Sequence, residues 1–141
     1  MTHAELKNLD TNSYFHKHDH RNKSPKKSQW TITEDEEKIC FENSLLSKWN
    51  EEHLSWGLHF NEKKVQYLGK SAEFESVSCD LFIAKFIDGD KNKQWHGYPA
   101  NPNGKKPQDI PPVNVLNDWL KNEYLRRATI RKITKGQKCS L

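Results

Sequence analysis

The sequence feature that most constrains the fold is residues 79–98, because this stretch has the pattern of two strands joined by a tight polar turn. Residues 81–87 are apolar except for Lys85, and their β-branched and aromatic side chains suit a pleated surface. A short apolar run bounded by turn residues is typical of a strand that is buried on both faces. The sequence therefore predicts a β-hairpin at the centre of the molecule.

The turn of this hairpin is predicted at residues 88–90, where Gly89 is expected to supply a positive φ angle without steric cost. Side chains alternate between the two faces of a strand, so His96 and Tyr98 are predicted to share one face and Trp95 to lie on the other. An imidazole is suited to taking a proton from a hydroxyl near neutral pH. His96 and Tyr98 are therefore the candidate catalytic residues, in a constellation with Arg126, Arg127 and Arg131.

A first helix is predicted from residue 34 to about residue 53. Thr33 and Glu36 have the spacing of a capping box, which marks the start of a helix. Apolar residues then recur every four positions from Phe41 to Trp49, as they do on one face of a helix. We expect this aromatic stripe to belong to the core.

The last third of the chain combines a helix signal with a basic segment. Proline is tolerated in the first turn of a helix, and apolar residues follow Pro112 at helical spacing, starting with Val113 and ending with Tyr124. Residues 126–134 alternate β-branched residues with cations, which predicts a strand that ends in a turn. The cations assigned to nucleic-acid binding are Arg126, Arg127, Arg131, Lys132, Lys135 and Lys138, together with Lys105 and Lys106 in the preceding proline-rich loop.

Residues 1–28 are predicted to be a disordered polar tail, rich in His and Lys. Their apolar content is too low to offset the entropy lost on ordering. Within this tail, His16, His18 and His20 alternate along the chain and could hold a metal ion weakly. A solvated tail is the favoured interpretation, so no metal site and no cofactor are predicted.

These signals together predict one α+β domain over residues 29–141. Its small antiparallel sheet is built on the central hairpin, and two helices are expected to pack on one face of the sheet. The hydrophobic fraction of 33% and the charged fraction of 30% suit one modest core with a solvated extension.

The charge of the chain is distributed unevenly. With histidine neutral, residues 1–30 carry +3, residues 31–100 carry −5 and residues 101–141 carry +6. An acidic body with a basic C-terminal third favours a polyanionic partner, which is either nucleic acid or an acidic protein surface.

Localisation is predicted from the cysteines and from the absence of long apolar runs. Cys40, Cys79 and Cys139 are widely spaced and form no CxxC pair, which indicates reduced thiols. No apolar segment has the length of a membrane span or the pattern of a signal peptide. We therefore expect a cytoplasmic protein without a membrane partner, and the sequence does not predict its oligomeric state.

The sequence constrains the function of the protein less than it constrains the fold. The chain lacks the GxGxxG, P-loop, HExxH and GxSxG motifs, so it identifies no nucleotide enzyme, zinc protease or hydrolase. The preferred hypothesis is a small module that binds RNA or DNA through the C-terminal basic strand.

Two alternatives remain open. One is a protein-interaction or regulatory module. The other is a metal-independent ribonuclease of the toxin type, in which His96 takes a proton from a ribose hydroxyl while the C-terminal arginines stabilise the phosphate. The sequence leaves open whether the protein is an enzyme.

Overall fold

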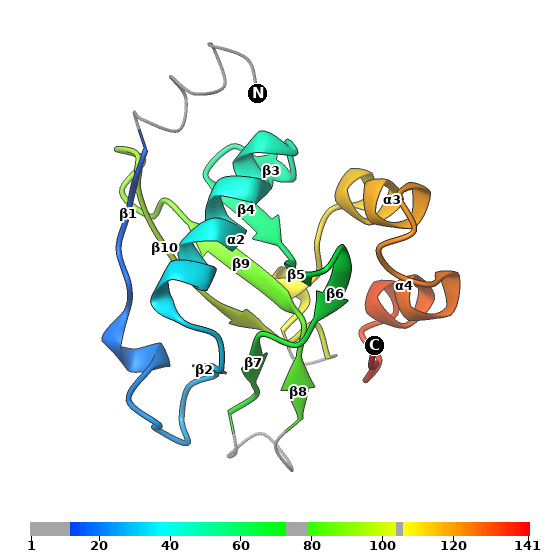
Figure 1. Ribbon diagram of the computed structural model, residues 1–141, viewed down its shortest axis with the longest axis horizontal. Helices are drawn as coiled ribbons and strands as arrows, with labels where there is room; N and C mark the ends of the chain where they lie inside the picture. The colour runs from blue at the N-terminus through cyan, green and yellow to red at the C-terminus, as the bar shows by residue number, and fades with distance from the viewer. Residues whose placement is uncertain (1–11, 73–78, 104–105) are drawn as a thin grey trace.

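A five-stranded sheet lies at the centre of the computed structural model, which describes residues 12–72, 79–103 and 106–141 (Figure 1). The strand order is β1-β10-β9-β4-β3, and every pair is antiparallel except β1 with β10. The strands are β1 (Ser13–Tyr14), β3 (Asn50–Glu51), β4 (Leu54–Gly57), β9 (Ile83–Ile87) and β10 (Gln94–Ala100).

The predicted central hairpin is confirmed as β9 and β10. Phe86 stands opposite Gly97 in their register, and Lys85 stands opposite Tyr98. Glycine is needed at position 97, because a Cβ atom there would overlap the Phe86 ring. Since His96 and Tyr98 are two positions apart on β10, they share one face of the sheet, as predicted.

The turn between β9 and β10 differs from the prediction. Positive φ angles occur at Lys91 (57°) and Lys93 (65°), whereas Gly89 has no positive φ. The Asp88 carboxylate organises the turn by accepting hydrogen bonds from the backbone N–H groups of Asn92 (3.2 Å) and Lys93 (2.9 Å). The Asp88 side chain therefore stabilises the turn, whereas the sequence had predicted that Gly89 would do so through its backbone.

The helix α2 (Glu34–Leu46) begins at the predicted capping box, formed by Thr33 and Glu36. Its predicted continuation to residue 53 is wrong. The chain leaves the helix through Lys48, which has a φ of 60°, and Trp49 then packs in a cluster with residues of the C-terminal helices. The four-residue spacing did not predict the end of the helix correctly, because Trp49 is buried in the core after the helix has already ended.

The helices cover opposite faces of the sheet. On β9, Phe86 packs in a cluster with Phe41 of α2, whereas Ile83, on the other face of the strand, packs with Trp119 of α3 (Val113–Lys121). Figure 1 shows α2 in front of the sheet and α3 to its right. This arrangement differs from the prediction that both helices pack on one face, and it explains why β9 is apolar on both sides.

α3 starts after Pro112 as predicted, but its buried face is different from the expected one. Val113 is 68% exposed, whereas Val115, Leu116 and Trp119 are buried. The apolar stripe was therefore assigned to the wrong side of the helix at its start.

The C-terminal basic segment forms a helix, α4 (Arg127–Thr134), so the predicted strand is wrong. Thr129, Ile130 and Ile133 are buried along one side of α4, a spacing of three to four residues. β-branched residues favour strands only weakly, and burial of this face against the core overrides that preference.

Residues 12–28 lie against the sheet and α2, which differs from the predicted disorder of residues 1–28. β1 pairs with β10, and the buried carboxylate of Glu37 accepts hydrogen bonds from the Arg21 side chain. The earlier residues 1–11 lie outside the described residues, so the prediction is not tested there.

Smaller elements complete the fold. One sheet has the order β2-β7-β8, and β5 pairs with β6 in another. The strands are β2 (Gln29–Trp30), β5 (His59–Asn61), β6 (Lys64–Gln66), β7 (Gly69–Lys70) and β8 (Asp80–Leu81), and the 3-10 helices are η1 (His18–His20) and η3 (Pro107–Asp109).

The fold is thus α+β with a mainly antiparallel sheet, as predicted. In the part of the chain that the structure describes, no helix combines the length and the apolar character that crossing a bilayer requires.

Candidate functional site

The outward side of α4 is the main candidate site, because it gathers most of the predicted cations. Arg127, Arg131 and Lys135 recur every four residues and therefore lie on one side of the helix, and Lys132 lies next to this row. All four are exposed, while the buried isoleucines of α4 occupy the opposite side. We call these four residues the basic face.

The cations of the basic face are not neutralised by acidic side chains of the described residues. The ion pairs of the described residues involve other cations. For example, Arg21 pairs with Glu37, and His59 pairs with Glu36. The Glu-rich start of α2 is thus engaged elsewhere. The basic face remains available to a partner.

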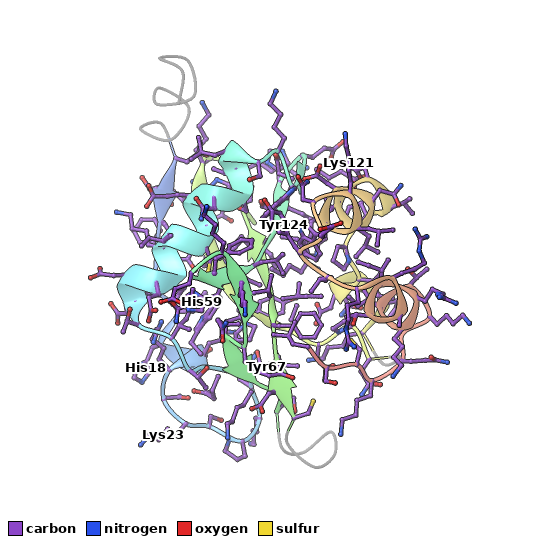
Figure 2. The ribbon with its side chains drawn as sticks, turned by 45° about the vertical axis from the view of Figure 1, so that its right-hand side comes forward. His18, Lys23, His59, Tyr67, Lys121 and Tyr124 are labelled. Atoms are coloured by element: carbon purple, nitrogen blue, oxygen red, sulfur yellow. The ribbon has the colours of Figure 1, made fainter. Side chains whose placement is uncertain are left out.

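A groove lies between the beginning of α4 and the β5–β6 turn, and its lining includes Glu123 but none of the four residues of the basic face. Lys63 and Lys64 line this groove of about 250 Å³ together with Arg126 and the half-buried Tyr124. Figure 2 shows Tyr124 beside α3, with Lys121 near the end of that helix. The sequence interpretation did not identify these lysines, because only the fold brings the β5–β6 turn beside α4.

The beginning of α4 is unusually basic. Arg126 is the N-cap residue and Arg127 the first helical residue, and the first turn contains neither an acidic residue nor a capping side chain. Cations at a helix N-terminus oppose the helix dipole and reduce stability. An anion bound there would remove this unfavourable interaction and would meet free backbone N–H groups.

The remaining predicted cations are distributed differently. Lys138 is exposed beyond the end of α4, and Lys105 lies outside the described residues. Lys106 precedes η3 and lines a separate cavity of about 300 Å³ that also includes His20 and Tyr98. It therefore does not join the groove described above.

His96 and Tyr98 are not brought together with the arginines. Burial lowers the pKa of His96, and the nearby Lys17 and His20 lower it further. Figure 1 shows α4 on the opposite side of the molecule from β1, which pairs with the beginning of β10. The ribonuclease constellation suggested by the sequence is therefore not assembled around His96.

Tyr98 instead belongs to a buried polar cluster. Its hydroxyl donates to Asp109 Oδ1 (2.7 Å), and Asp109 Oδ2 accepts the backbone N–H of Asn101 (3.1 Å). Lys85 Nζ lies 3.8 Å from Asp109 Oδ1 and donates to the carbonyl of Gln108 (2.6 Å). Burial raises the pKa of Tyr98, and the charge of Asp109 raises it further. This cluster anchors the loop before α3 to the sheet.

The three N-terminal histidines do not converge. His16 Nδ1 lies 3.2 Å from Glu37, whereas His20 Nδ1 lies 2.8 Å from the carbonyl of Ser28 and His18 is exposed. Among the described residues, no group of three or more His, Cys, Asp or Glu side chains is placed to hold a metal ion.

Comparisons with known proteins found no family model that matches the chain, and no curated protein or solved structure that matches it significantly. The candidate site therefore rests on its charge and geometry.

Proposed function

We propose that this protein binds nucleic acid through the basic face of α4. The observation that supports the proposal is the gathering of exposed cations, which form no ion pair with the described residues, on one side of a helix whose other side is packed in the core. Each lysine or arginine that approaches a phosphate releases condensed counterions, which is the main source of affinity for a polyanion.

The arrangement favours contacts to the backbone of the nucleic acid over contacts to bases. Arginine can hold phosphate oxygens with two parallel hydrogen bonds, and such contacts position a protein without reading sequence. The groove near the beginning of α4 adds Lys63, Lys64 and Arg126, opposed by Glu123, as further cations that a strand could contact. We therefore expect binding that tolerates many sequences, in RNA or in DNA.

A cytoplasmic location belongs to this proposal. Cys40, Cys79 and Cys139 are free thiols, as a reducing compartment would keep them. An acidic protein surface is the alternative partner, since it would be attracted by the same cations.

Charge reversal on the basic face tests the proposal. We expect R127E/R131E to weaken binding to labelled single-stranded RNA and duplex DNA more than tenfold. The slope of log affinity against log salt should fall by about 0.7 to 0.9 for each phosphate that the variant leaves without a cation. Fluorescence anisotropy over a salt series measures both quantities. Glutamate at position 127 suits a helix start, so α4 should stay folded.

The matched control is K38E/K70E, which makes the same change in net charge at exposed residues of α2 and β7. It should retain most of the affinity. Equal reductions in both variants would show a general charge effect and contradict a site on α4. Binding to polyglutamate as tight as binding to RNA would favour the acidic protein surface.

A further inference from the structure

A further cavity, lined by both polar and apolar side chains, lies where the C-terminal end of α2 meets the β3–β4 turn and the β9–β10 turn. Its volume is about 440 Å³, which is within the range of small-molecule sites. Lys48, Lys91 and Lys93 line it together with His53 and Asp88. We call this cavity the turn pocket.

Asp88 joins the two turns that form the turn pocket. It is only 3% exposed, its backbone N–H donates to the carbonyl of His53 (2.9 Å), and its carboxylate lies 3.5 Å from His53 Nδ1. Burial acts to raise the pKa of Asp88, but the backbone N–H groups of Lys93, Asn92 and Gln94 and the His53 side chain outweigh it, so the pKa is lowered. The oxygens of the Asp88 carboxylate therefore already have partners within the protein.

The contact with Asp88 orients the His53 ring. Because Nδ1 faces the carboxylate, Nε2 is the ring nitrogen left for a ligand, and the side chain is 43% exposed. The remaining charges around the turn pocket are the three lysines and Glu52. Asp88 keeps its negative charge, so three lysines against Asp88 and Glu52 give the pocket a net charge of +1 with His53 neutral.

The backbone of the turn pocket is strained at four positions, all occupied by long charged side chains. Lys48, Glu52, Lys91 and Lys93 have φ angles of 60°, 53°, 57° and 65°. Glycine adopts such angles without cost, whereas a residue with a Cβ atom loses stability there. Strain that persists in a group of neighbouring residues is typical of a functional site. The turn pocket thus holds four of the eight non-glycine residues with positive φ among the described residues.

The opposite wall of the turn pocket is apolar. Leu45 and Leu46 of α2 line it, as does Trp95, whose indole N–H already donates to Asn12 Oδ1 (2.8 Å). A ligand that suits both walls carries an anionic group and a flat, largely apolar group.

We propose that the turn pocket binds a nucleoside monophosphate. The phosphate lies among Lys48, Lys91, Lys93 and Nε2 of His53, and the base lies against Leu45 and Trp95. Ammonium groups are suitable donors to phosphate oxygens, and because Nδ1 of His53 faces Asp88, Nε2 donates to the phosphate in the protonated form of the ring. This site is separate from α4 and does not depend on the proposed nucleic-acid binding.

The experiment compares a double glycine variant of the turn pocket with a single glycine variant elsewhere. K91G/K93G removes two cations while giving the turn a residue that prefers its φ angles, so the free variant should melt at the same or a higher temperature. K23G is the control, because Lys23 also has a positive φ (61°) but lies at the other end of the molecule from the C-terminal end of α2 (Figure 2). Calorimetric titrations use AMP, GMP, CMP and UMP, with adenosine and inorganic phosphate as partial ligands.

We expect at least one of the four nucleotides to bind the wild-type protein and K23G with the same Kd. K91G/K93G should raise that Kd about tenfold or more, since hydrogen bonds to charged groups contribute strongly to affinity. Adenosine and inorganic phosphate should bind more weakly than the nucleotide. The proposal is overturned if no nucleotide binds at millimolar concentration, if K91G/K93G binds as wild type does, or if inorganic phosphate binds as tightly as the nucleotides.

Discussion

Glu37 shows how one buried residue can order a polar segment. Its carboxylate is 0% exposed, accepts hydrogen bonds from Arg21 Nε (3.1 Å) and Nη2 (2.7 Å), and also accepts one from the hydroxyl of Tyr14. Burial raises the pKa of Tyr14, and the charge of Glu37 raises it further, so this phenol stays a donor. Glu37 thus joins two residues of the N-terminal arm, residues 12–28, to α2.

We predict that Glu37→Gln lowers the free energy of unfolding by about 3 kcal/mol, because it leaves the buried Arg21 contact without its negative partner. Urea denaturation measures the decrease. The control is Glu34→Gln on the same helix, whose exposed carboxylate lies 3.9 Å from His16 and should contribute about 0.5 kcal/mol or less. Similar decreases in both variants would contradict a special role for Glu37.

Residue-scale features of this kind could not be predicted from the sequence. The arm has too few apolar residues to form a core, and that observation is correct. It is ordered by pairing of β1 with β10 and by hydrogen bonds to Glu37, which lies in the first turn of a helix that the sequence did predict. A capping-box pattern identifies where the acidic turn begins, but it does not show which carboxylate faces inward.

At the scale of elements, prediction succeeded where local and tertiary preferences agree. The β9–β10 hairpin and the start of α2 are such cases, since their apolar runs and capping residues suit the environment they meet. α4 is the opposite case. Its Thr and Ile residues favour a strand locally, but their three- and four-residue spacing allows them to fill the core next to α3 only as a helix.

The helical packing of α4 leads to a prediction about its buried side. Ile133→Ala should lower the free energy of unfolding by about 2 to 5 kcal/mol, because Ile133 is 0% exposed in the cluster beneath α3. Ile39→Ala makes the same change on α2 at a residue that is 55% exposed, and it should cost less than about 0.5 kcal/mol. Equal effects in guanidinium denaturation would show that Ile133 does not pack as described.

Nucleic-acid binding should survive Ile133→Ala at low temperature, because the basic face lies on the other side of α4. From the sequence, the same cations were placed on a predicted strand, in which Ile133 would share a side with Arg127 and Arg131. The four residues of the basic face were thus identified from charge alone, whereas their gathering on one side depends on the helix, and Lys63 and Lys64 of the groove were not identified.

At the scale of the whole molecule, β9 connects the two hydrophobic clusters. Ile83 packs on one side with Leu116 of α3, and Phe86 packs on the other with Phe41 of α2. The sequence predicted a single domain over residues 29–141. Because β9 is buried on both faces, we expect the two clusters to unfold together.

We therefore predict that Phe41→Ala and Leu116→Ala each lower the midpoint of one shared unfolding transition. Both side chains are buried, so each change should cost about 2 to 5 kcal/mol, whereas Val113→Ala at an exposed position of α3 should have little effect. Far-ultraviolet circular dichroism and tryptophan fluorescence should report the same midpoint in every variant, as a two-state domain requires. Separate midpoints, with Phe41→Ala shifting one and Leu116→Ala the other, would divide the chain into two units along β9.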